Sequence, residues 1–442
     1  MALSGLDIYK LLPKTNCREC GFATCLAFAM QLAKKAVGID KCPYLSPEAK
    51  KVLESSALPP IKLITMGTGE QKLEIGNESV MFRHEEKFHR PCGLGFVIDD
   101  SLTDSEIKDK LARIAKLSFE RVGQKLDVNL VALKQVKDAK RFTEVVKLDS
   151  GLTTLPIGLI SEDSTALKDA LITLKDKRTL IYRATKENFT QMAPLAKEFK
   201  ATLVASAPDI NSLSTLTQEL NKLGIDEIML DTGNKTISEK IWDLTQIRRL
   251  ALKKSNRSLG FPAITLINKA DPYEEAMEAA SYICKYSGII LLKNIEAWQT
   301  LALLTLRQNI YTDPQKPLQI EAKLYPIGAA NDKSPVLITT NFSLSYFTVL
   351  GEVEASKVPS YILSVDTEGM SVLTAWAAEK FTPDKISDTV NKLGVKETVS
   401  HNRLIIPGYV AMMSGELEEK SGWQIIVGPK EASGIPSFLR NL

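Results

Sequence analysis

The cysteines Cys17, Cys20, Cys25 and Cys42 are the residues of this chain whose spacing points most directly to chemistry. They follow the pattern C-x2-C-x4-C-x16-C, and Pro43 comes directly after the last one. Four cysteine thiolates suit either a zinc ion or a four-iron cluster. Zinc sites usually consist of two short cysteine pairs, which this spacing does not match, so the pattern favours a 4Fe–4S cluster. A cluster that only staples a small domain together is the alternative.

The other cysteines and the histidines have no ligand spacing. We expect Cys284 to be a buried core thiol and Cys92 to be structural. The histidines His84, His89 and His401 are expected to be structural or solvated, which limits acid–base chemistry. The sequence contains no glycine-rich phosphate loop and no dinucleotide fingerprint after a predicted strand, so it indicates no ATP or NAD site.

The amino-acid composition indicates no particular class of binding partner. The 442 residues carry a net charge of +3 from 56 basic and 53 acidic side chains, which gives no argument for binding nucleic acid or a membrane surface. There is no apolar run of the roughly 18 residues that a transmembrane helix needs, and the N-terminus does not resemble a signal peptide. We therefore expect a cytoplasmic protein, in which clustered cysteines are more often metal ligands than disulfides.

The sequence divides into three predicted parts. Residues 1–58 are too few to bury much of a core, so a metal site would help to hold them. Residues 61–311 begin with a β-ribbon, which includes a strand at 79–82, and continue from about residue 93 as alternating apolar runs and amphipathic helices. Residues 326–442 predict a small α/β domain with four parallel strands.

The middle part predicts a closed parallel barrel of about eight βα units, with an open doubly wound sheet as the alternative. Its strands are expected at residues 95–98, 128–133, 145–148, 157–160, 179–182, 202–205, 227–230, 263–267 and 288–292.

Four loops of the C-terminal part combine small residues with backbone amides. They follow the predicted strands, at residues 339–342, 366–371, 406–411 and 427–434. Since the carboxyl ends of parallel strands meet at one edge of an open sheet, where such sheets bind ligands, these loops form a candidate site. Helix N-termini there suit a large cofactor with amide and phosphate groups. Ordinary glycine turns and helix caps are the alternative interpretation.

Taken together, the chain resembles the large subunit of the corrinoid iron–sulfur protein of the reductive acetyl-CoA pathway. The resemblance covers the whole length and rests on the segment Cys17-Arg18-Glu19-Cys20-Gly21-Phe22-Ala23-Thr24-Cys25 with Cys42-Pro43, followed by the barrel-like middle and the small C-terminal α/β unit. It implies an α/β multidomain fold with a small N-terminal 4Fe–4S domain, a central (β/α)8 TIM barrel and a C-terminal Rossmann-like corrinoid-binding domain. The four cysteines match the family's cluster ligands one for one. By their position at the sheet edge, the expected corrinoid contacts are Thr340, Asn341, Gly369, Met370, Ser371, Val372, Leu373, Thr374, Gly408, Ala411, Gly428, Pro429 and Ala432.

The resemblance implies a methyl carrier, which is a methyltransferase component that works only with partner enzymes. Co(I) would accept a methyl group from methyl-tetrahydrofolate held by a separate methyltransferase, and methyl-Co(III) would donate it to acetyl-CoA synthase in its complex with carbon monoxide dehydrogenase. A small subunit would complete a heterodimer, and a reductive activator protein would be a further partner. Neither nucleic acid nor a membrane is expected as a partner.

The expected state of the corrinoid follows from a missing motif. Because the sequence has no Asp-x-His-x-x-Gly loop, the cobalamin or related cobamide would be bound base-off and without a protein histidine. A cobalt without a lower ligand is easier to reduce to Co(I), which prefers no axial ligand. The 4Fe–4S cluster, of a type whose potentials extend to about −700 mV, would reactivate Co(II) when Co(I) is lost.

Two other functions fit parts of the sequence. The chain could be an iron–sulfur electron-transfer subunit without corrinoid chemistry, with the C-terminal part as a docking module. It could also be a pterin-binding methyltransferase that uses strand-end residues of the barrel, namely Asp99, Asp100, Asp231 and Asn268.

Overall fold

The computed structural model describes residues 4–33, 36–57, 59–175 and 177–442. The chain forms two compact units, Met1–Phe119 with Asp127–Tyr311, and Glu120–Leu126 with Thr312–Leu442. In the part of the chain that the structure describes, no helix is both long enough and apolar enough to cross a membrane.

The first residues fold into a small helical segment that carries the cysteines. Its elements are α1 (Gly5–Leu11), α2 (Cys25–Ala33), the 3-10 helix η1 (Ile39–Lys41) and α3 (Pro47–Ala57). Helix α1 begins with a capping box, in which the Ser4 hydroxyl accepts from the Asp7 N–H and the Asp7 carboxylate accepts from the Ser4 N–H. The core consists of a few side chains, among them Ile8, Phe28 and Leu53. So small a core gives little stability by itself.

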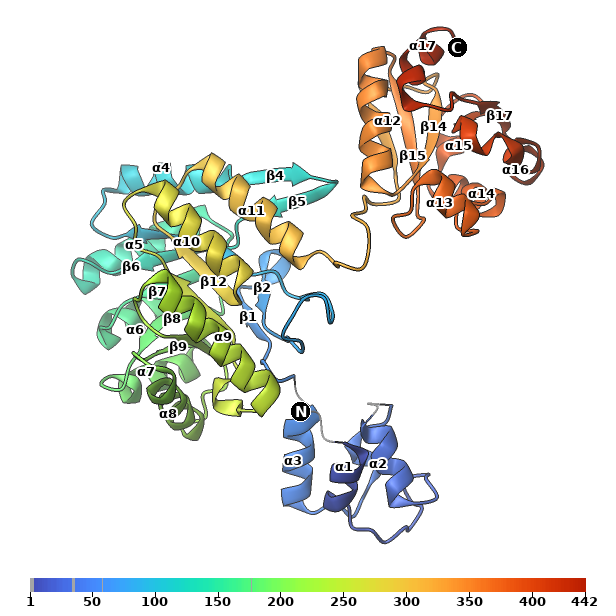
Figure 1. Cartoon of the computed structure of the whole chain (residues 1–442). Helices are drawn as coiled ribbons and strands as arrows, with labels where there is room; N and C mark the ends of the chain where they lie inside the picture. Colours follow the sequence, from blue (N-terminus) through green and yellow to red (C-terminus); the bar gives the residue numbers. More distant parts are fainter. Residues whose placement is uncertain (1–3, 34–35, 58, 176) are drawn as a thin grey trace. The chain divides into compact units, whose positions relative to one another are not determined.

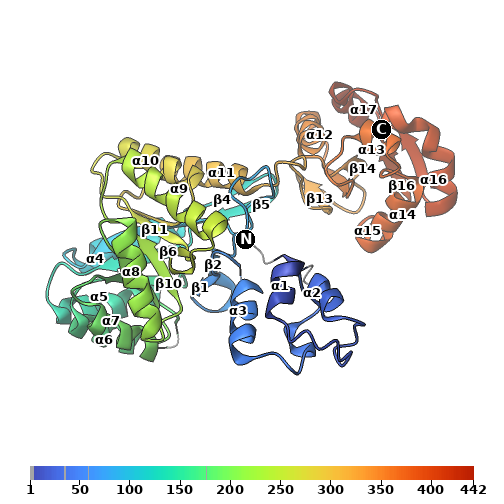
Figure 2. The same ribbon diagram turned by 60° about the horizontal axis from the view of Figure 1, so that its bottom comes forward.

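Eight parallel strands close into a barrel, which confirms the predicted (β/α)8 fold over the open-sheet alternative. The strand order is β10-β11-β12-β3-β6-β7-β8-β9. The strands are β3 (Gly93–Asp99), β6 (Leu130–Lys134), β7 (Ile157–Ile160), β8 (Leu180–Ala184), β9 (Thr202–Ser206), β10 (Ile228–Asp231), β11 (Ala263–Leu266) and β12 (Ser287–Leu292). The helices that surround them are α4 (Asp104–Ala115), α5 (Ala139–Leu152), α6 (Ser164–Thr173), α7 (Phe189–Glu198), α8 (Ile210–Lys222), α9 (Ile237–Lys254), α10 (Pro272–Cys284) and α11 (Ala297–Tyr311), with the short η3 (Arg257–Leu259) after α9 (Figures 1 and 2).

A two-stranded hairpin closes the amino end of the barrel. It consists of β1 (Ile64–Met66) and β2 (Leu73–Ile75), which are antiparallel and connected through η2 (Gly69–Gln71). The apolar side chains of both strands are buried in one cluster with interior residues such as Leu180 and Met229. The first residue of β3, Gly93, lies directly against Leu73, whose Cδ2 atom would be 2.7 Å from a Cβ atom at this position. This end of the barrel is therefore filled by packing.

Two of the predicted strands were wrong. Residues 145–148 lie inside α5, where Phe142, Val145, Val146 and Asp149 are buried at helical spacing. A short apolar run does not distinguish a strand from a buried helix segment. Residues 79–82 form no strand, because the Val80 carbonyl accepts a hydrogen bond from the Arg248 guanidinium instead of pairing with a neighbouring strand.

The sequence analysis also missed a hairpin, β4 (Ser118–Arg121) with β5 (Gln124–Asp127), that follows α4. Its turn residues Val122 and Gly123 both have positive φ, as tight hairpin turns require. The tip, Glu120–Leu126, belongs to the second compact unit, in which Val122 packs against the cluster that contains Ile320 and Tyr346.

The second unit contains a five-stranded sheet in the order β13-β15-β14-β16-β17. Its strands are β13 (Leu324–Ile327), β14 (Val336–Thr340), β15 (Ser360–Val365), β16 (Arg403–Ile406) and β17 (Gln424–Val427). Its helices are α12 (Ser343–Ser356), α13 (Val372–Ala377), α14 (Pro383–Lys392), α15 (Val395–Thr398), η4 (Gly408–Met413), α16 (Ser414–Ser421), η5 (Ala432–Gly434) and α17 (Ile435–Arg440). The four predicted parallel strands are confirmed, and β13 adds an antiparallel edge that was not predicted.

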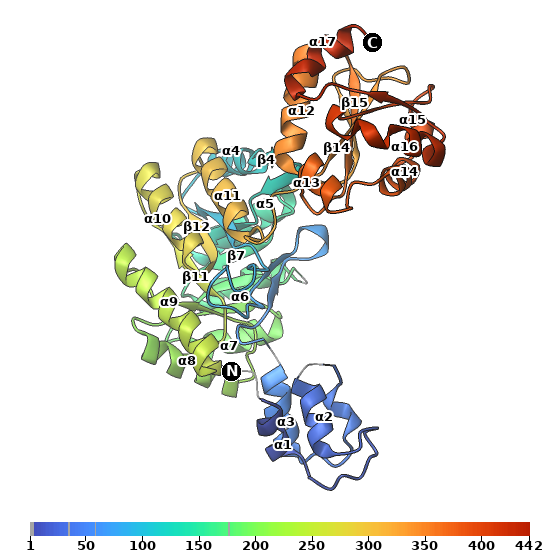
Figure 3. The same ribbon diagram turned by 45° about the vertical axis from the view of Figure 1, so that its right-hand side comes forward.

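Both faces of this sheet are covered because alternate strand residues point to opposite sides. Leu337, Ile362 and Ile405 pack with α12 and α17. Ile338 and Leu363 pack on the other face with α14 and α16. Figure 3 shows the two groups of helices on opposite sides of the strands.

Asp149 of α5 is a buried carboxylic acid in the barrel. Its side chain is 0% exposed, and neither carboxylate oxygen has a hydrogen-bond partner among the described residues. Burial raises the pKa of Asp149 from 3.8 to about 7, and the nearby Lys177 opposes this rise only in part. The ionised form is therefore unfavourable in the folded protein.

We predict that Asp149 makes the barrel less stable as the pH rises. Because its pKa is higher in the folded state, the folded chain keeps a proton between pH 3.8 and about 7 that the unfolded chain has released. The free energy of unfolding should therefore fall across this window and level off above it, by about 4 kcal/mol in total. Urea unfolding of the wild type and Asp149→Asn at a series of pH values measures the effect. The variant should lose this pH dependence, and parallel stability curves for the two proteins would contradict the prediction.

Candidate functional site

The carboxyl edge of the C-terminal sheet has a switch point between β14 and β16. From β14 the chain continues through α12 to β15 on one side, and it later returns to β16 on the other side. At such a point the loops diverge and leave a crevice, which is where open α/β sheets bind ligands. A cavity of about 330 Å³ lies here.

The side chain of Asn341 holds the loops at this edge together. Its amide nitrogen donates to Asp366 Oδ1 at 3.0 Å and to Gln319 Oε1 at 3.2 Å. Its amide oxygen accepts from the backbone N–H groups of Thr367 at 2.9 Å and Gly369 at 3.0 Å. Asn341 is only 3% exposed, so these bonds are shielded from water. One side chain at the end of β14 thus fixes the loop that follows β15.

The loops after β16 and β17 pack backbone against backbone. The Gly408 N–H donates to the Pro429 carbonyl at 3.1 Å, and the Gly428 N–H donates to the Ile406 carbonyl at 2.9 Å. A Cβ atom at Gly408 would lie 2.6 Å from the Gly428 carbonyl oxygen and 2.8 Å from the Lys430 nitrogen. Only glycine allows this approach, which forms the second side of the crevice.

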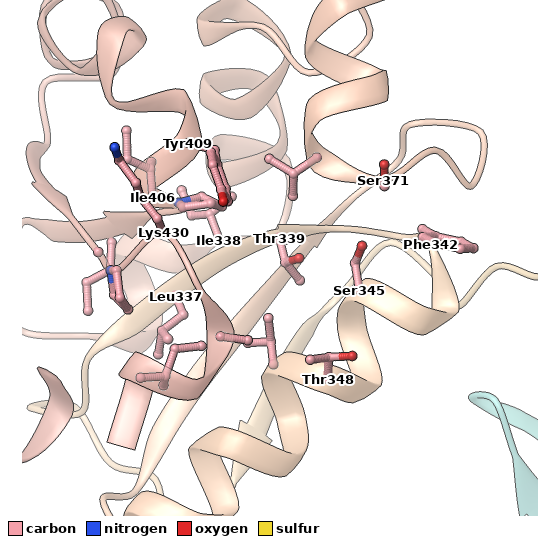
Figure 4. Close-up of a pocket in the computed structure, with 18 of the residues that line it drawn as sticks. Leu337, Ile338, Thr339, Phe342, Ser345, Thr348, Ser371, Ile406, Tyr409 and Lys430 are labelled. Atoms are coloured by element: carbon pink, nitrogen blue, oxygen red, sulfur yellow. The ribbon is translucent and has the colours of Figure 1, made fainter. Parts of the chain in front are cut away.

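The cavity itself has mainly apolar walls. The strands provide Leu337, Ile338, Thr339, Ile405 and Ile406. Helix α12 and the residue before it provide Phe342, Leu344, Ser345, Thr348 and Val349, and the last loop and α17 provide Gly428, Pro429, Lys430, Ala432 and Ile435. Ser371, Val372, Pro407 and Tyr409 complete the lining. Figure 4 shows side chains of the strands, of α12 and of the following loops gathered around the cavity.

The structure brings only some of the predicted contact residues to this cavity. Ser371, Val372, Gly428, Pro429 and Ala432 line it. The other predicted residues lie at the same edge but outside the lining, namely Thr340, Asn341, Gly369, Met370, Leu373, Thr374, Gly408 and Ala411. Asn341 and Gly408 shape the loops there, and Leu373 is 46% exposed.

Sequence reasoning missed the walls because it considered only the loops. The alternation of residues along β14 could have identified Leu337, which points to the same face of the sheet as Thr339. Ser345, Thr348 and Val349 share one face of α12 at helical spacing, but only the packing of α12 on the sheet turns that face into a cavity wall.

The cysteine loop wraps around the start of α2. Cys25 is the first residue of this helix, and its N–H donates to Asn16 Oδ1 at 2.8 Å, while the Asn16 N–H points at Cys25 Sγ at 3.4 Å. Lys14, Asn16, Arg18 and Gly21 all have positive φ, so the loop turns repeatedly back on itself. Backbone N–H groups in such turns form the concave nests seen at iron–sulfur sites.

The four thiols of this loop are all free. Burial raises the pKa of the Cys42 thiol, and the charges of Cys20, Cys17 and Cys25 raise it further. Within the described ranges no three His, Cys, Asp or Glu side chains are drawn together tightly enough to hold a metal ion. The chemistry and spacing of the donor set fit a cluster, and the ligand assignment stays a prediction.

Comparison with known proteins gives relatives over the full length of the chain. A protein from Moorella thermoacetica named corrinoid/iron–sulfur protein large subunit is 43% identical over 441 residues, which cover 100% of this chain and 99% of that protein. The chain belongs to the corrinoid/iron–sulfur protein large-subunit family. The gamma subunit of the acetyl-CoA decarbonylase/synthase complex from Methanothermobacter thermautotrophicus is 36% identical over 456 residues, which cover 100% of this chain and 99% of that subunit.

Two family models match as well. The model of the CO dehydrogenase/acetyl-CoA synthase delta subunit matches residues 63–439, and a model for an Fe–S cluster matches residues 12–44. The second range contains all four clustered cysteines of this corrinoid/iron–sulfur protein family member.

The mouth of the barrel in this family member is held by internal bonds. The Asp231 carboxylate accepts hydrogen bonds from Lys240 Nζ at 2.7 Å, Tyr182 Oη at 2.9 Å and Ser206 Oγ at 3.0 Å. Burial alone would raise the pKa of Asp231, but Lys240 and the two hydroxyls outweigh it and lower the pKa. Asp100 accepts two backbone N–H bonds from residues 136–137. Two of the four residues considered for pterin binding are thus already engaged, which disfavours that alternative.

The isolated cysteines and the histidines take no part in these sites. Cys92, which was expected to be structural, is buried, whereas Cys284 is exposed, so the prediction that Cys284 is a buried core thiol was wrong. Cys284 is the last residue of α10 and follows the buried residues Tyr282 and Ile283. The rotation of the helix from one residue to the next places the Cys284 side chain on the exposed face. His401 is structural, because its ring nitrogens contact the Ser334 carbonyl and the backbone N–H of residue 403.

We predict that Asn341→Leu releases the loop after β15. The N–H groups of Thr367 and Gly369 would lose their acceptor, and each buried donor left unpaired costs about 1–3 kcal/mol. Hydrogen exchange of these two amides should accelerate, and the C-terminal unit should unfold at lower urea concentration.

Thr340→Val is the matched control. Thr340 is the neighbouring buried residue, and its hydroxyl has no partner among the described residues, so its removal should leave both measurements unchanged. Unaltered protection of Thr367 and Gly369 in Asn341→Leu would show that Asn341 does not hold the loop.

Proposed function

We propose that this chain is a corrinoid-dependent methyl carrier of the acetyl-CoA pathway. The observation that carries the proposal is the apolar cavity at the switch point of the C-terminal sheet, with loops fixed around it by Asn341 and Gly408. When bound, the cobalt supplies the nucleophile that takes a methyl group from methyl-tetrahydrofolate on a separate methyltransferase and passes it to acetyl-CoA synthase. Full-length similarity to a corrinoid/iron–sulfur protein large subunit supports this assignment.

The dimensions of the site suggest which part of a corrinoid each surface holds. At about 330 Å³ the cavity lies at the small end of the range for ligand sites, so it suits the aromatic base of the nucleotide tail but not the macrocycle. Helix α12 begins at the same edge without a capping side chain. The Ser343 N–H donates to the Leu318 carbonyl, and the N–H groups that follow it in the first turn suit the phosphate of the tail.

The macrocycle would cover the apolar rim of the edge. Leu373 and Trp376 of α13 are 46% and 39% exposed, and Tyr409 and Met412 of η4 are 46% and 73% exposed. So many large apolar side chains at a ligand-binding edge indicate that something covers them. A flat corrin ring with its tail in the cavity has a suitable size and polarity.

The base would be bound away from the cobalt. No histidine is among the residues that line the cavity, and His401 is held by backbone groups elsewhere in the unit. The histidine of the second compact unit is therefore used within the fold and does not line the cavity. This supports a base-off cobalamin or related cobamide, which is easier to reduce.

We further assign Cys17, Cys20, Cys25 and Cys42 as the ligands of a 4Fe–4S cluster. The Asn16 side chain caps α2 at Cys25 and orients this thiol, and the positive-φ residues of the loop direct backbone N–H groups to its concave side. The bound cluster supplies the electron that returns oxidised cobalt to Co(I).

The domain boundaries and partners form part of the same proposal. Residues 1–58 would be the cluster domain, 61–311 the barrel, and 326–442 the corrinoid-binding domain. A small subunit, carbon monoxide dehydrogenase/acetyl-CoA synthase, the methyltransferase and a reductive activator would be the partners, in the cytoplasm. Relatives that are named as subunits of the acetyl-CoA decarbonylase/synthase complex support the first two.

Metal analysis and optical spectroscopy test the function. We expect cobalt and about four iron atoms per chain in anaerobically purified protein, together with absorption bands that change when the cobalt is reduced and methylated. A protein with iron but no cobalt under all conditions would be an electron-transfer subunit instead, and the corrinoid proposal would be wrong.

Cys20→Ala separates the roles of the two cofactors. Methyl transfer from chemically pre-reduced protein should persist, since the cobalt site lies in the other compact unit. Reactivation of Co(II) by an electron donor should be lost. Ser433→Ala, an exposed position in the last loop, is a control that should affect neither reaction. Loss of transfer from pre-reduced Cys20→Ala would instead indicate a structural role for the cluster.

A further inference from the structure

Cys25 differs from the other three clustered cysteines in how firmly the fold holds it. It is the buried member of the set, whereas Cys17 is exposed and Cys20 and Cys42 are partly exposed. The Cys25 side chain packs in the small core of the N-terminal helical segment, together with Phe28 and other apolar residues. The folded chain by itself therefore fixes the position of this thiol.

Asn16 contacts Cys25 twice, once through its backbone and once through its side chain. The Asn16 N–H donates to Cys25 Sγ at 3.4 Å, and Asn16 Oδ1 accepts from the Cys25 N–H at 2.8 Å. Asn16 has a φ of 50°, a left-handed conformation that asparagine adopts more readily than most residues. We call this pair of hydrogen bonds the Asn16–Cys25 clasp.

The clasp also satisfies part of the start of helix α2. The first N–H groups of a helix have no acceptor within the helix itself. At α2 the N–H of Cys25 donates to Asn16, and the N–H of Ala27 donates to the Thr24 hydroxyl at 3.1 Å. Both Asn16 and Thr24 thus cap the same helix end, and Asn16 in addition donates to a sulfur.

An N–H group that donates to a ligand sulfur influences the cluster that the sulfur holds. Hydrogen bonds to the sulfurs help to set the reduction potential of iron–sulfur clusters. The donated N–H places partial positive charge beside the thiolate, which favours the more negative, reduced state of the cluster. Asn16 is not itself a predicted ligand, so its influence would pass through Cys25.

We propose that Asn16 is a positioning residue for the cluster, which presets Cys25 as the anchor ligand and raises the reduction potential through its N–H. This inference rests on the proposed function, in which the four cysteines hold a 4Fe–4S cluster. Cys25 would be the ligand already in place, and the less buried Cys17, Cys20 and Cys42 would close around the cluster when it binds. The clasp would therefore act in the cluster-free chain as well as in the loaded protein.

Hydrogen exchange and thiol alkylation of the cluster-free full-length chain, both followed by mass spectrometry, test the anchor role. Asn16→Gly keeps the left-handed backbone accessible and removes the side-chain acceptor. Exchange of the Cys25 amide and alkylation of the Cys25 thiol should both become about tenfold faster, as expected for the loss of one hydrogen bond. Asn16→Asp keeps an oxygen acceptor at this position and should preserve the wild-type protection of the Cys25 amide.

A redox titration of the loaded protein, followed by electron paramagnetic resonance, tests the effect on the potential. In Asn16→Gly the N–H is no longer held against the sulfur. The ratio of reduced to oxidised cluster at a fixed potential should fall about tenfold, which corresponds to ~59 mV for one electron. Thr24→Ala is the matched control, because it removes a cap bond from the same helix end without removing a bond to Cys25. It should leave the potential unchanged.

Three outcomes would count against these assignments. Equal shifts of the potential in Asn16→Gly and Thr24→Ala would show that only the stability of α2 matters, and the tuning role of Asn16 would be wrong. Alkylation of wild-type Cys25 as fast as that of the exposed Cys17 would exclude Cys25 as a preset anchor. A wild-type chain that held zinc or no metal, in every anaerobic preparation, would overturn the proposed cluster itself, whatever the Asn16 variants showed.

Discussion

The hydrogen bonds of the Asn341 amide are the interaction on which the candidate site depends. This one buried side chain joins the end of β14 to the loop after β15 and to the segment before the sheet, through Thr367, Gly369 and Gln319. Each bond satisfies a polar group that burial would otherwise leave unpaired. The loop after β15 is therefore held in place by a buried polar network.

The cavity also depends on the topology of the sheet. Because the chain turns to opposite sides of β14 when it forms β15 and β16, no loop crosses the space between β14 and β16. The apolar residues of both strands, such as Leu337 and Ile405, then remain open to a ligand, with α12 and α17 as the outer wall.

Much of the fold could be predicted because apolar runs and amphipathic helices alternate clearly along the chain. All eight barrel strands fall on predicted runs, and the additional run at 145–148 failed because Val145 and Val146 also fit a helix face. The hairpin at Val122 and Gly123 was missed because its strands are short and polar. In the site, the loops were predicted at the correct edge, but only part of the lining was, since Ser345, Thr348 and Ile435 reach the cavity only through helix packing.

The sequence by itself determined the cysteine pattern, the order of the three parts and the absence of a cobalt-binding histidine motif, because these depend only on residue type and spacing. Tertiary structure alone decided the roles of individual residues. Asn341 was predicted as a ligand contact, but its amide is used by the neighbouring loop. Thr339 belongs to the predicted loop at residues 339–342 but was not among the predicted contacts, and it lines the cavity. The reason is physical: whether a polar group is available to a ligand depends on which neighbours already satisfy it, and those neighbours come from distant parts of the chain.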